Sequence, residues 1–177
     1  MSLTEDEKAD LQAQTEDDKK ILQILLQEIE AQMPNFSLQK KLDTSELREF
    51  VRPPLAVQEV QFGVMLMLGY PPKQAKEWVE AQKLMKEKSF SQSLDSFNPI
   101  ESFNADTHHA ISKLMSDSKC MKSNSVSSVS SVANELFTWL KQIHEFHSGL
   151  HDQIAAAQEL RIRVEQNEDI LLKLSWL

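Results

Sequence analysis

Glycine and cysteine are scarce in this sequence, which has 3 glycines and 1 cysteine, Cys120, among 177 residues. So few glycines leave few positions for sharp turns. With 41% of its residues hydrophobic, the chain is predicted to be folded and rich in helix. The length allows one domain of ordinary size. A single cysteine excludes an internal disulfide and favours a cytosolic protein.

The sequence also lacks long apolar runs and any surplus of positive charge. No stretch approaches the ~20 apolar residues that a membrane span requires, and the N-terminal residues have no signal-peptide character. The net charge is −8; acids exceed bases in residues 1–39 and 146–177, whereas residues 40–145 hold 13 of each. Nucleic acids and membrane surfaces attract basic faces, so neither is a predicted partner.

Motifs for catalysis are missing as well. The glycines are isolated, and none begins the G-x-x-x-x-G-K-[ST] pattern that cradles phosphates. We therefore predict no enzyme activity and no cofactor in this chain. Cys120 has no base positioned by the sequence, which favours an ordinary thiol over a nucleophile.

Three histidines, His144, His147 and His151, fall on one face of a predicted helix. Their spacing could collect a transition metal, but no cysteine or carboxylate is set to complete a site. A solvated helix face is the favoured interpretation, and no metal is predicted.

The most apolar stretch, Arg52–Tyr70, predicts one short helix that is buried on nearly all sides. Pro54 fits its first turn, and Gly69 fits the left-handed residue that often ends a helix. The polar residues in it are few: Gln58, Glu59 and Gln61. Such a helix must be wrapped by others, so it is the predicted centre of the domain.

Seven-residue patterns occupy both ends of the chain. In the first arm the core positions are Leu11, Thr15, Asp18, Leu22, Leu25, Ile29, Gln32 and Phe36. In the second they are Ile143, Phe146, Leu150, Gln153, Ala157, Leu160, Val164, Asn167, Leu171 and Leu174. Each helix alone would expose an apolar seam, so the arms are predicted to pair with each other, antiparallel.

The heptads also predict a register, because antiparallel pairing sets one arm's first core position against the other's second. Leu25 then lies opposite Ala157, and Asp18 lies opposite Val164. Several opposed pairs are polar, and a seam this weak could slide by about half a heptad at small cost. Pro34 is predicted to kink or end the first arm.

Between the arms the sequence predicts short helices. Leu38–Val51 is predicted to form one, with Leu47, Phe50 and Val51 in the core; a helix that begins at Ser45 is the alternative. Farther along, the predictions are an amphipathic helix over Lys73–Met85 with Trp78 and Val79 inward, a helix capped by Asp106, and a last long helix that begins near Ser125.

The order of these motifs resembles the stalk tip of dynein heavy chains. Five landmarks between residues 36 and 150 carry the resemblance: Leu47–Val57 running on into V-M-L-M-L-G, Lys73–Lys76, Phe90–Phe97, Ala110–Met115 and Trp139. In that family a short helix ends in a Pro-Pro-x-x-Val junction, and a buried helix that ends in L-L-G follows.

The resemblance implies an all-α fold, an antiparallel two-stranded coiled-coil hairpin capped by a small globular helical bundle. The implied domains are arms at 1–37 and 143–177 and a globular tip at 38–142. The implied function is a stalk head that binds microtubules and couples to a motor ring, with the ATPase elsewhere in a full-length protein. Tubulin and a dynein-type motor assembly are the implied partners. The implied location is the cytoplasmic cytoskeleton, with the axoneme of cilia or flagella as one setting.

The candidate microtubule-binding residues are Lys40, Lys41, Arg48, Lys73, Lys76 and Lys113. Lys40 and Lys41 match a pair on a helix that rests on tubulin in that family, while Lys73 and Lys76 match other basic positions. Ordinary solvated lysines remain the alternative for both pairs.

The sequence departs from the family pattern at other basic positions. Ser116 and Asp117 stand in a segment that is basic in the family, and serines near Ser127–Ser130 replace a usual arginine. Contacts with the acidic outer surface of tubulin gain on-rate and affinity from basic residues, so binding is predicted to be weak. The alternative is a non-motor structural or adaptor module that keeps the fold and binds another protein.

Overall fold

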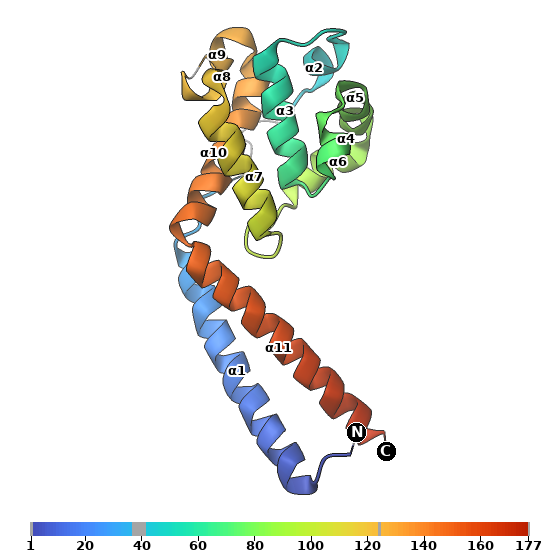
Figure 1. Ribbon diagram of the computed structural model, residues 1–177, viewed down its shortest axis with the longest axis vertical. Helices are drawn as coiled ribbons and strands as arrows, with labels where there is room; N and C mark the ends of the chain where they lie inside the picture. The colour runs from blue at the N-terminus through green and yellow to red at the C-terminus, as the bar shows by residue number, and fades with distance from the viewer. Residues whose placement is uncertain (1, 37–41, 124, 177) are drawn as a thin grey trace. The chain divides into compact units, whose positions relative to one another are not determined.

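The computed structural model describes residues 2–36, 42–123 and 125–176, and the regular structure within them is entirely helical (Figure 1). The prediction of an all-α fold is therefore confirmed. The chain forms two compact units. We call Met1–Pro34 together with Leu150–Leu177 the helix-pair unit, and Asn35–Gly149 the bundle unit. None of the helices in the described residues is long and apolar enough to span a membrane.

The helix-pair unit consists of α1 (Glu5–Ala31) and α11 (His151–Ser175), which lie side by side and run antiparallel (Figure 1). α1 ends shortly before Pro34, as the restriction on interior prolines predicts. The buried residues of the pair are Thr15, Asp18 and Ile29 of α1 and Ile154, Ala157 and Val164 of α11. All but Ile154 are predicted seam positions.

The first turn of α11 departs from the predicted seam. Gln153 is exposed and Ile154 is buried in its place. The reason is a break at Leu150, whose φ of −123° and ψ of 20° separate α11 from the preceding helix. The heptad count carried across this break therefore fails in the first turn beyond it.

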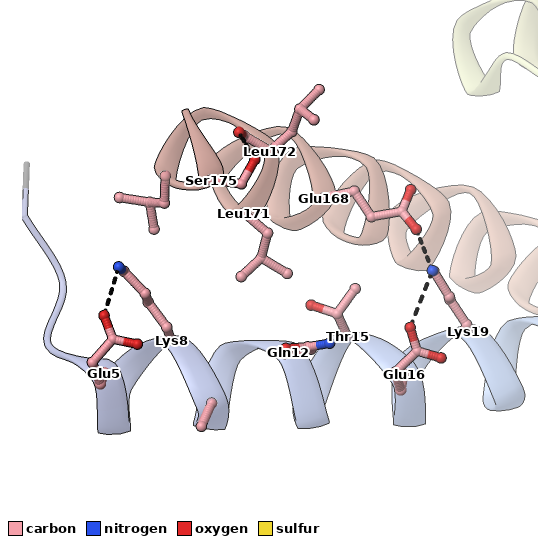
Figure 2. Close-up of a pocket in the computed structure, with 12 residues that line it drawn as sticks. Glu5, Lys8, Gln12, Thr15, Glu16, Lys19, Glu168, Leu171, Leu172 and Ser175 are labelled. Atoms are coloured by element: carbon pink, nitrogen blue, oxygen red, sulfur yellow. Dashed lines mark hydrogen bonds and ion pairs between the residues drawn. The ribbon is translucent and has the colours of Figure 1, made fainter. Parts of the chain in front are cut away.

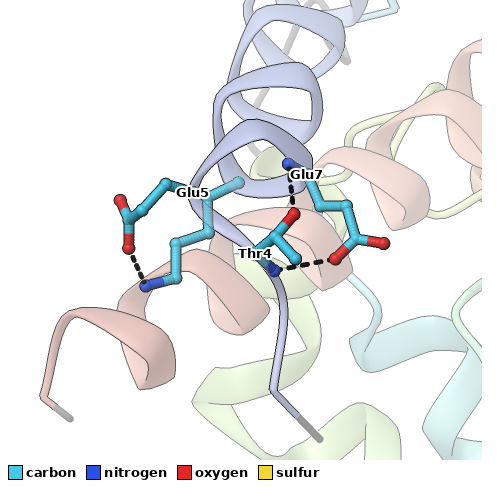
Figure 3. Close-up of polar contacts among 4 residues, drawn as sticks. Thr4, Glu5 and Glu7 are labelled. Carbon is cyan, nitrogen blue, oxygen red and sulfur yellow. Dashed lines mark hydrogen bonds and ion pairs between the residues drawn. The ribbon is translucent and has the colours of Figure 1, made fainter.

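A capping box begins α1 (Figure 3). The Thr4 hydroxyl accepts a hydrogen bond from the Glu7 N–H at 3.2 Å, and the Glu7 carboxylate accepts one from the Thr4 N–H at 2.7 Å. These bonds satisfy donors that a helix start leaves without partners. The bond from the Thr4 N–H also lowers the pKa of Glu7.

The helices of the bundle unit are α2 (Ser45–Glu49), α3 (Leu55–Met67), α4 (Pro72–Lys76), α5 (Trp78–Lys86), α6 (Lys88–Asp95), α7 (Ala105–Asp117), α8 (Lys119–Lys122), α9 (Val126–Val129) and α10 (Ser131–Gly149). α3 lies at the centre and packs against α4, α7 and α10, with further contacts to α5, α8 and α9 (Figure 1). The predicted domain centre is therefore confirmed.

The end of α3 follows the predicted chemistry. Gly69 has a φ of 95°, in the left-handed region that favours glycine. The Gly69 N–H donates to the Leu66 carbonyl and the Tyr70 N–H donates to the Met65 carbonyl, each at 3.0 Å. This is the Schellman pattern, which satisfies the last carbonyls of the helix.

The sides of α3 differ from the prediction at two positions. Leu55 is exposed because it begins the helix, whereas Gln61, predicted on the polar side, is only 2% exposed. Helices contact α3 on its polar side as well as on its apolar sides, so the packing also covers Gln61.

Two predicted helices are shorter than expected. Only Ser45–Glu49 is helical within the described part of the 38–51 segment, which matches the alternative beginning at Ser45. Val51, predicted in the core, is 90% exposed because it lies in the bend that leads to the proline pair. In the 73–85 segment, Glu77 has a ψ of 112° and separates α4 from α5. This break changes the helical phase, so Val79 is exposed.

Two further boundaries were predicted wrongly. Asn104, not Asp106, caps α7, because its side chain accepts hydrogen bonds from the N–H groups of Asp106 and Thr107. The predicted last long helix is divided into α9, α10 and α11, with breaks at Ser130 and Leu150. Ser130 has an extended backbone, and its hydroxyl accepts a hydrogen bond from the Ala133 N–H, which starts a new helix.

Candidate functional site

Side chains of α5 hold α2 in place. Gln82 Nε2 donates hydrogen bonds to the carbonyl oxygens of Arg48 at 2.8 Å and Phe50 at 2.7 Å, and Trp78 Nε1 donates to that of Phe50 at 2.9 Å. A helix of five residues is not stable alone, and its last carbonyls need partners. The α5 side chains supply these partners and fix the position of α2.

The junction between α2 and α3 carries exposed side chains. Gln58 of α3 reaches back, and its Nε2 donates to the Pro53 carbonyl at 2.9 Å. This bond fixes the proline pair against the first turn of α3. Val51, Arg52 and Leu55 lie exposed around it. The junction therefore offers one base and two apolar side chains to a partner.

A buried serine connects α8 to α3. The Ser118 hydroxyl donates a short hydrogen bond to the Glu59 carboxylate of α3 and accepts one from the Met121 N–H at 3.1 Å. The same hydroxyl thus caps α8 and ties it to the central helix. α8 is positioned by this contact, and its Lys119 and Lys122 are exposed.

These anchored segments gather at one end of the bundle unit. α2, α8, α9 and the first turn of α3 lie at the end opposite the last turn of α10 (Figure 1). We call this set of segments the distal end of the bundle unit. The distal end packs against the hydrophobic core formed by α3, α7 and α10, and this packing fixes the positions of its short helices.

The predicted binding residues differ in their exposure to solvent. Lys73 and Lys76 are exposed on α4, and Lys113 is exposed on α7. Arg48 is only partly exposed, and its Nε is buried without a hydrogen-bond partner among the described residues. Lys40 and Lys41 lie outside the described residues.

Three exposed bases at the distal end were not predicted from the sequence: Arg52, Lys119 and Lys122. They lie outside the basic positions that the family resemblance implies. Each of the three lies in or beside a short helix that the hydrogen bonds of a polar side chain hold in place. Exposed bases of this kind make charge-assisted contacts with an acidic surface.

The prediction of a solvated histidine face is wrong for the two histidines on α10. His147 is buried, and its Nε2 lies 2.6 Å from the Pro99 carbonyl oxygen. His144 lies half-buried with Nε2 2.7 Å from the Ser112 hydroxyl, and its ring stacks on His108 with 4.9 Å between ring centres. Burial lowers the pKa of His144. These rings therefore serve the packing of α10.

The histidines do not gather into a metal centre. Among the residues that the structure describes, no group of three or more His, Cys, Asp or Glu side chains is placed to hold a metal ion.

Comparison with known proteins agrees with the fold and the chain order. A family model described as the microtubule-binding stalk of dynein motor matches residues 4–170. A search of curated proteins found no match. The match covers the whole bundle unit and most of the helix pair. The chain therefore belongs to the family of the microtubule-binding stalk of dynein motors.

Proposed function

We propose that the bundle unit binds microtubules and that the helix pair couples it to a motor ring. The observation that carries this proposal is the family match, which spans the bundle and both helices that flank it in the chain. Tubulin and a dynein-type motor assembly are then the partners. The cytoplasmic cytoskeleton is the setting, and the axoneme of cilia or flagella is one place within it.

The binding surface that we propose combines the predicted bases with those at the distal end: Lys40, Lys41, Arg48, Arg52, Lys73, Lys76, Lys113, Lys119 and Lys122. Four of these bases are exposed on short helices that pack against α3, which supports their inclusion: Lys73 and Lys76 of α4, and Lys119 and Lys122 of α8. The equal numbers of acids and bases in residues 40–145 leave no net positive field. We therefore expect weak binding that falls as salt rises.

Co-sedimentation with microtubules tests this surface. Exposed ion pairs contribute about 0.2–1 kcal/mol each, so loss of two lysine contacts should weaken binding by roughly 2- to 30-fold. We expect this loss for Lys119→Glu with Lys122→Glu, and for Lys73→Glu with Lys76→Glu. Lys20→Glu, an exposed base on α1, is the matched control and should leave binding unchanged.

The reverse change should strengthen binding. Ser116 and Asp117 are both exposed at the end of α7, next to α8. Replacement of both by lysine adds positive charge where the sequence lacks it, and the affinity at fixed salt should rise. An unchanged affinity in both the lysine and glutamate variants would place the contact on another surface.

A non-motor adaptor module is the second candidate function. The observation that favours it is the exposure of Val51 and Leu55 in a segment, residues 40–145, that holds as many acids as bases. Apolar side chains grouped in this way suit a protein partner that is not strongly acidic. A folded chain that fails to bind microtubules even at low salt would favour this function over microtubule binding.

A further inference from the structure

An exposed serine lies in the last turn of α7. The Ser116 hydroxyl donates a hydrogen bond to the Lys113 carbonyl of the same helix at 3.0 Å. The side chains of Ser116 and Lys113 are both exposed. A base three residues before a serine or threonine belongs to the charge patterns by which basic-directed protein kinases choose their substrates. Ser116 is therefore a candidate for phosphorylation.

The same pattern occurs five times in the chain, so the sequence alone does not select Ser116. The matching residues, each with a lysine three positions earlier, are Thr44, Ser89, Ser91, Ser116 and Ser125. A kinase cleft binds its substrate as an extended segment, so the five residues from the base to the residue after the hydroxyl must leave their helix. We call these five residues the window of a match. Local opening of a window is cheap where few buried contacts are lost.

Burial separates the five windows. Thr44 is itself only 7% exposed. Phe90, which belongs to both windows of α6, is 1% exposed, and Val126, in the window that runs into α9, is fully buried. Residues 113–117, all of which the structure describes, include no buried side chain. The structure thus favours Ser116 over the other four matches.

The position of Ser116 near a helix end lowers the cost of opening further. α7 ends at Asp117, and the next residue, Ser118, has an extended backbone with a ψ of 115°. Ile111, the buried residue of α7, lies more than one turn before Ser116. The last turn can therefore open while the rest of α7 stays packed.

The bases around Ser116 are available to a phosphate. On α1, by contrast, Lys19 is already paired with acids, one of which is Glu168 of α11 (Figure 2). Within the described part of the chain, no ion pair includes Lys113, Lys119 or Lys122. A phosphate on Ser116 would lie one helical turn from Lys113 and three residues before Lys119, and phosphates form strong charge-assisted hydrogen bonds with such bases.

We propose that a basic-directed protein kinase phosphorylates Ser116 and that the phosphate weakens the microtubule-binding surface. The second half of this proposal rests on the proposed function. Residues 113–122 hold three bases and one acid. A phosphoserine carries a charge of about −1.5 to −2 at pH 7, so one phosphate cancels this local surplus of positive charge. It also occupies bases that would otherwise face the acidic surface of tubulin.

The modification is a phosphoryl transfer from a nucleoside triphosphate. Ser116 Oγ forms a bond to the γ-phosphorus of ATP in the kinase cleft, and the bond from that phosphorus to the bridging oxygen breaks. The nucleoside diphosphate leaves, and the hydroxyl proton passes to the carboxylate base of the kinase.

Kinase treatment of the full chain, followed by mass spectrometry, tests the site. The probes are MgATP with the catalytic subunits of cyclic-AMP-dependent and calcium–calmodulin-dependent protein kinases. We expect Ser116 in the folded chain to react at least about tenfold faster than Ser89, Ser91 or Ser125, because only its window opens without loss of buried contacts. Synthetic peptides of residues 83–93 and 110–120 are the matched controls, and their rates should agree within about threefold, since neither is folded.

Two results would overturn the site. One is the absence of phosphate at Ser116 of the folded chain, with or without reaction of the peptides. The other is modification of Ser89, Ser91 or Ser125 in the folded chain at a rate equal to or above that of Ser116.

Co-sedimentation with microtubules tests the effect of the phosphate. The phosphorylated chain should bind roughly 2- to 30-fold more weakly than the unmodified chain at the same salt, as for the loss of two lysine contacts. Ser116→Ala after the same kinase treatment should bind like the unmodified chain, and circular dichroism checks that all three remain folded.

The outcomes separate this proposal from the proposed function. Equal binding of the phosphorylated and unmodified chains would overturn the effect of the phosphate while microtubule binding itself stands. A folded, unmodified chain that does not bind would reject the proposed function and the effect on it together, and the mapped phosphate would still decide whether Ser116 is a modification site.

Discussion

Replacement of Gln61 by methionine should stabilise the bundle unit. Gln61 lies in the middle of α3, is 2% exposed, and neither Oε1 nor Nε2 has a hydrogen-bond partner among the described residues. An amide buried without partners costs about 1–3 kcal/mol relative to an apolar group. Methionine has a similar length and fills the same space without the polar atoms.

The expected gain is therefore about 1–3 kcal/mol, which corresponds to a rise of roughly 2–12 °C in the midpoint of thermal unfolding for a chain of this length. Tryptophan fluorescence in a Trp176→Phe background reports the bundle, because Trp78 and Trp139 both lie in it and Trp176 belongs to the helix-pair unit. Gln58→Met is the matched control on the same helix. Its side chain bonds to the Pro53 carbonyl, so its loss should destabilise by about 0.5–1.5 kcal/mol.

A loss of stability in Gln61→Met greater than about 1 kcal/mol would refute the reasoning, because it would mean that the amide makes favourable contacts in the folded state. Equal effects of the two substitutions would also refute it. In that case the burial of Gln61 would not determine the effect.

The remaining predictions concern α10 and its contact with α3. Burial holds the pKa of His144 below its ordinary value, so the unfolded chain binds protons more readily, and the free energy of unfolding should fall as pH drops below about 6.5. Urea unfolding at pH 7.5 and 5.5 should show a smaller decrease in His144→Gln; an equal decrease would contradict this assignment. Gly63→Ala should destabilise by about 1–2 kcal/mol, because an added Cβ would lie 2.6 Å from Leu140 Cδ2 in a filled core. Gly149→Ala, which meets nothing within 4 Å, is its control, and equal stability of the two variants would show that the Leu140 side chain moves aside at little cost.

Local patterns predicted the elements whose signals lie within a few residues. The capping chemistry of Gly69, the proline limit on α1 and the apolar run of α3 each depend on neighbours in sequence, and the structure confirms them. The heptads likewise predicted most of the seam, since burial on a paired helix follows its own period.

The failures arise from partners distant in sequence. A break at Glu77 starts α5, and Trp78 then donates a hydrogen bond to the carbonyl of Phe50, a residue far away in sequence. The apolar pattern of one continuous helix predicts neither the break nor this bond. His147 finds its partner at Pro99, so its burial was not visible in the spacing of the histidines. The burial of Gln61 is likewise a property of the helices around α3.

The candidate site was predictable only in part. Exposed lysines on α4 and α7 could be named from the family resemblance, but the sequence did not reveal that Arg48 is partly buried. The exposed bases of α8 depend on a contact between Ser118 and Glu59, which lie far apart in the chain. Local sequence patterns do not predict a contact between residues this far apart.

The central claim is that this chain binds microtubules through exposed bases of the bundle unit. Co-sedimentation of the whole chain with microtubules at low and moderate salt, with circular dichroism to confirm folding, tests it most directly. We predict weak binding at low salt that decreases at moderate salt and decreases further when Lys119 and Lys122 are changed to glutamate. A folded chain that remains in the supernatant at low salt would contradict the claim, as would tight binding that neither salt nor these substitutions affect.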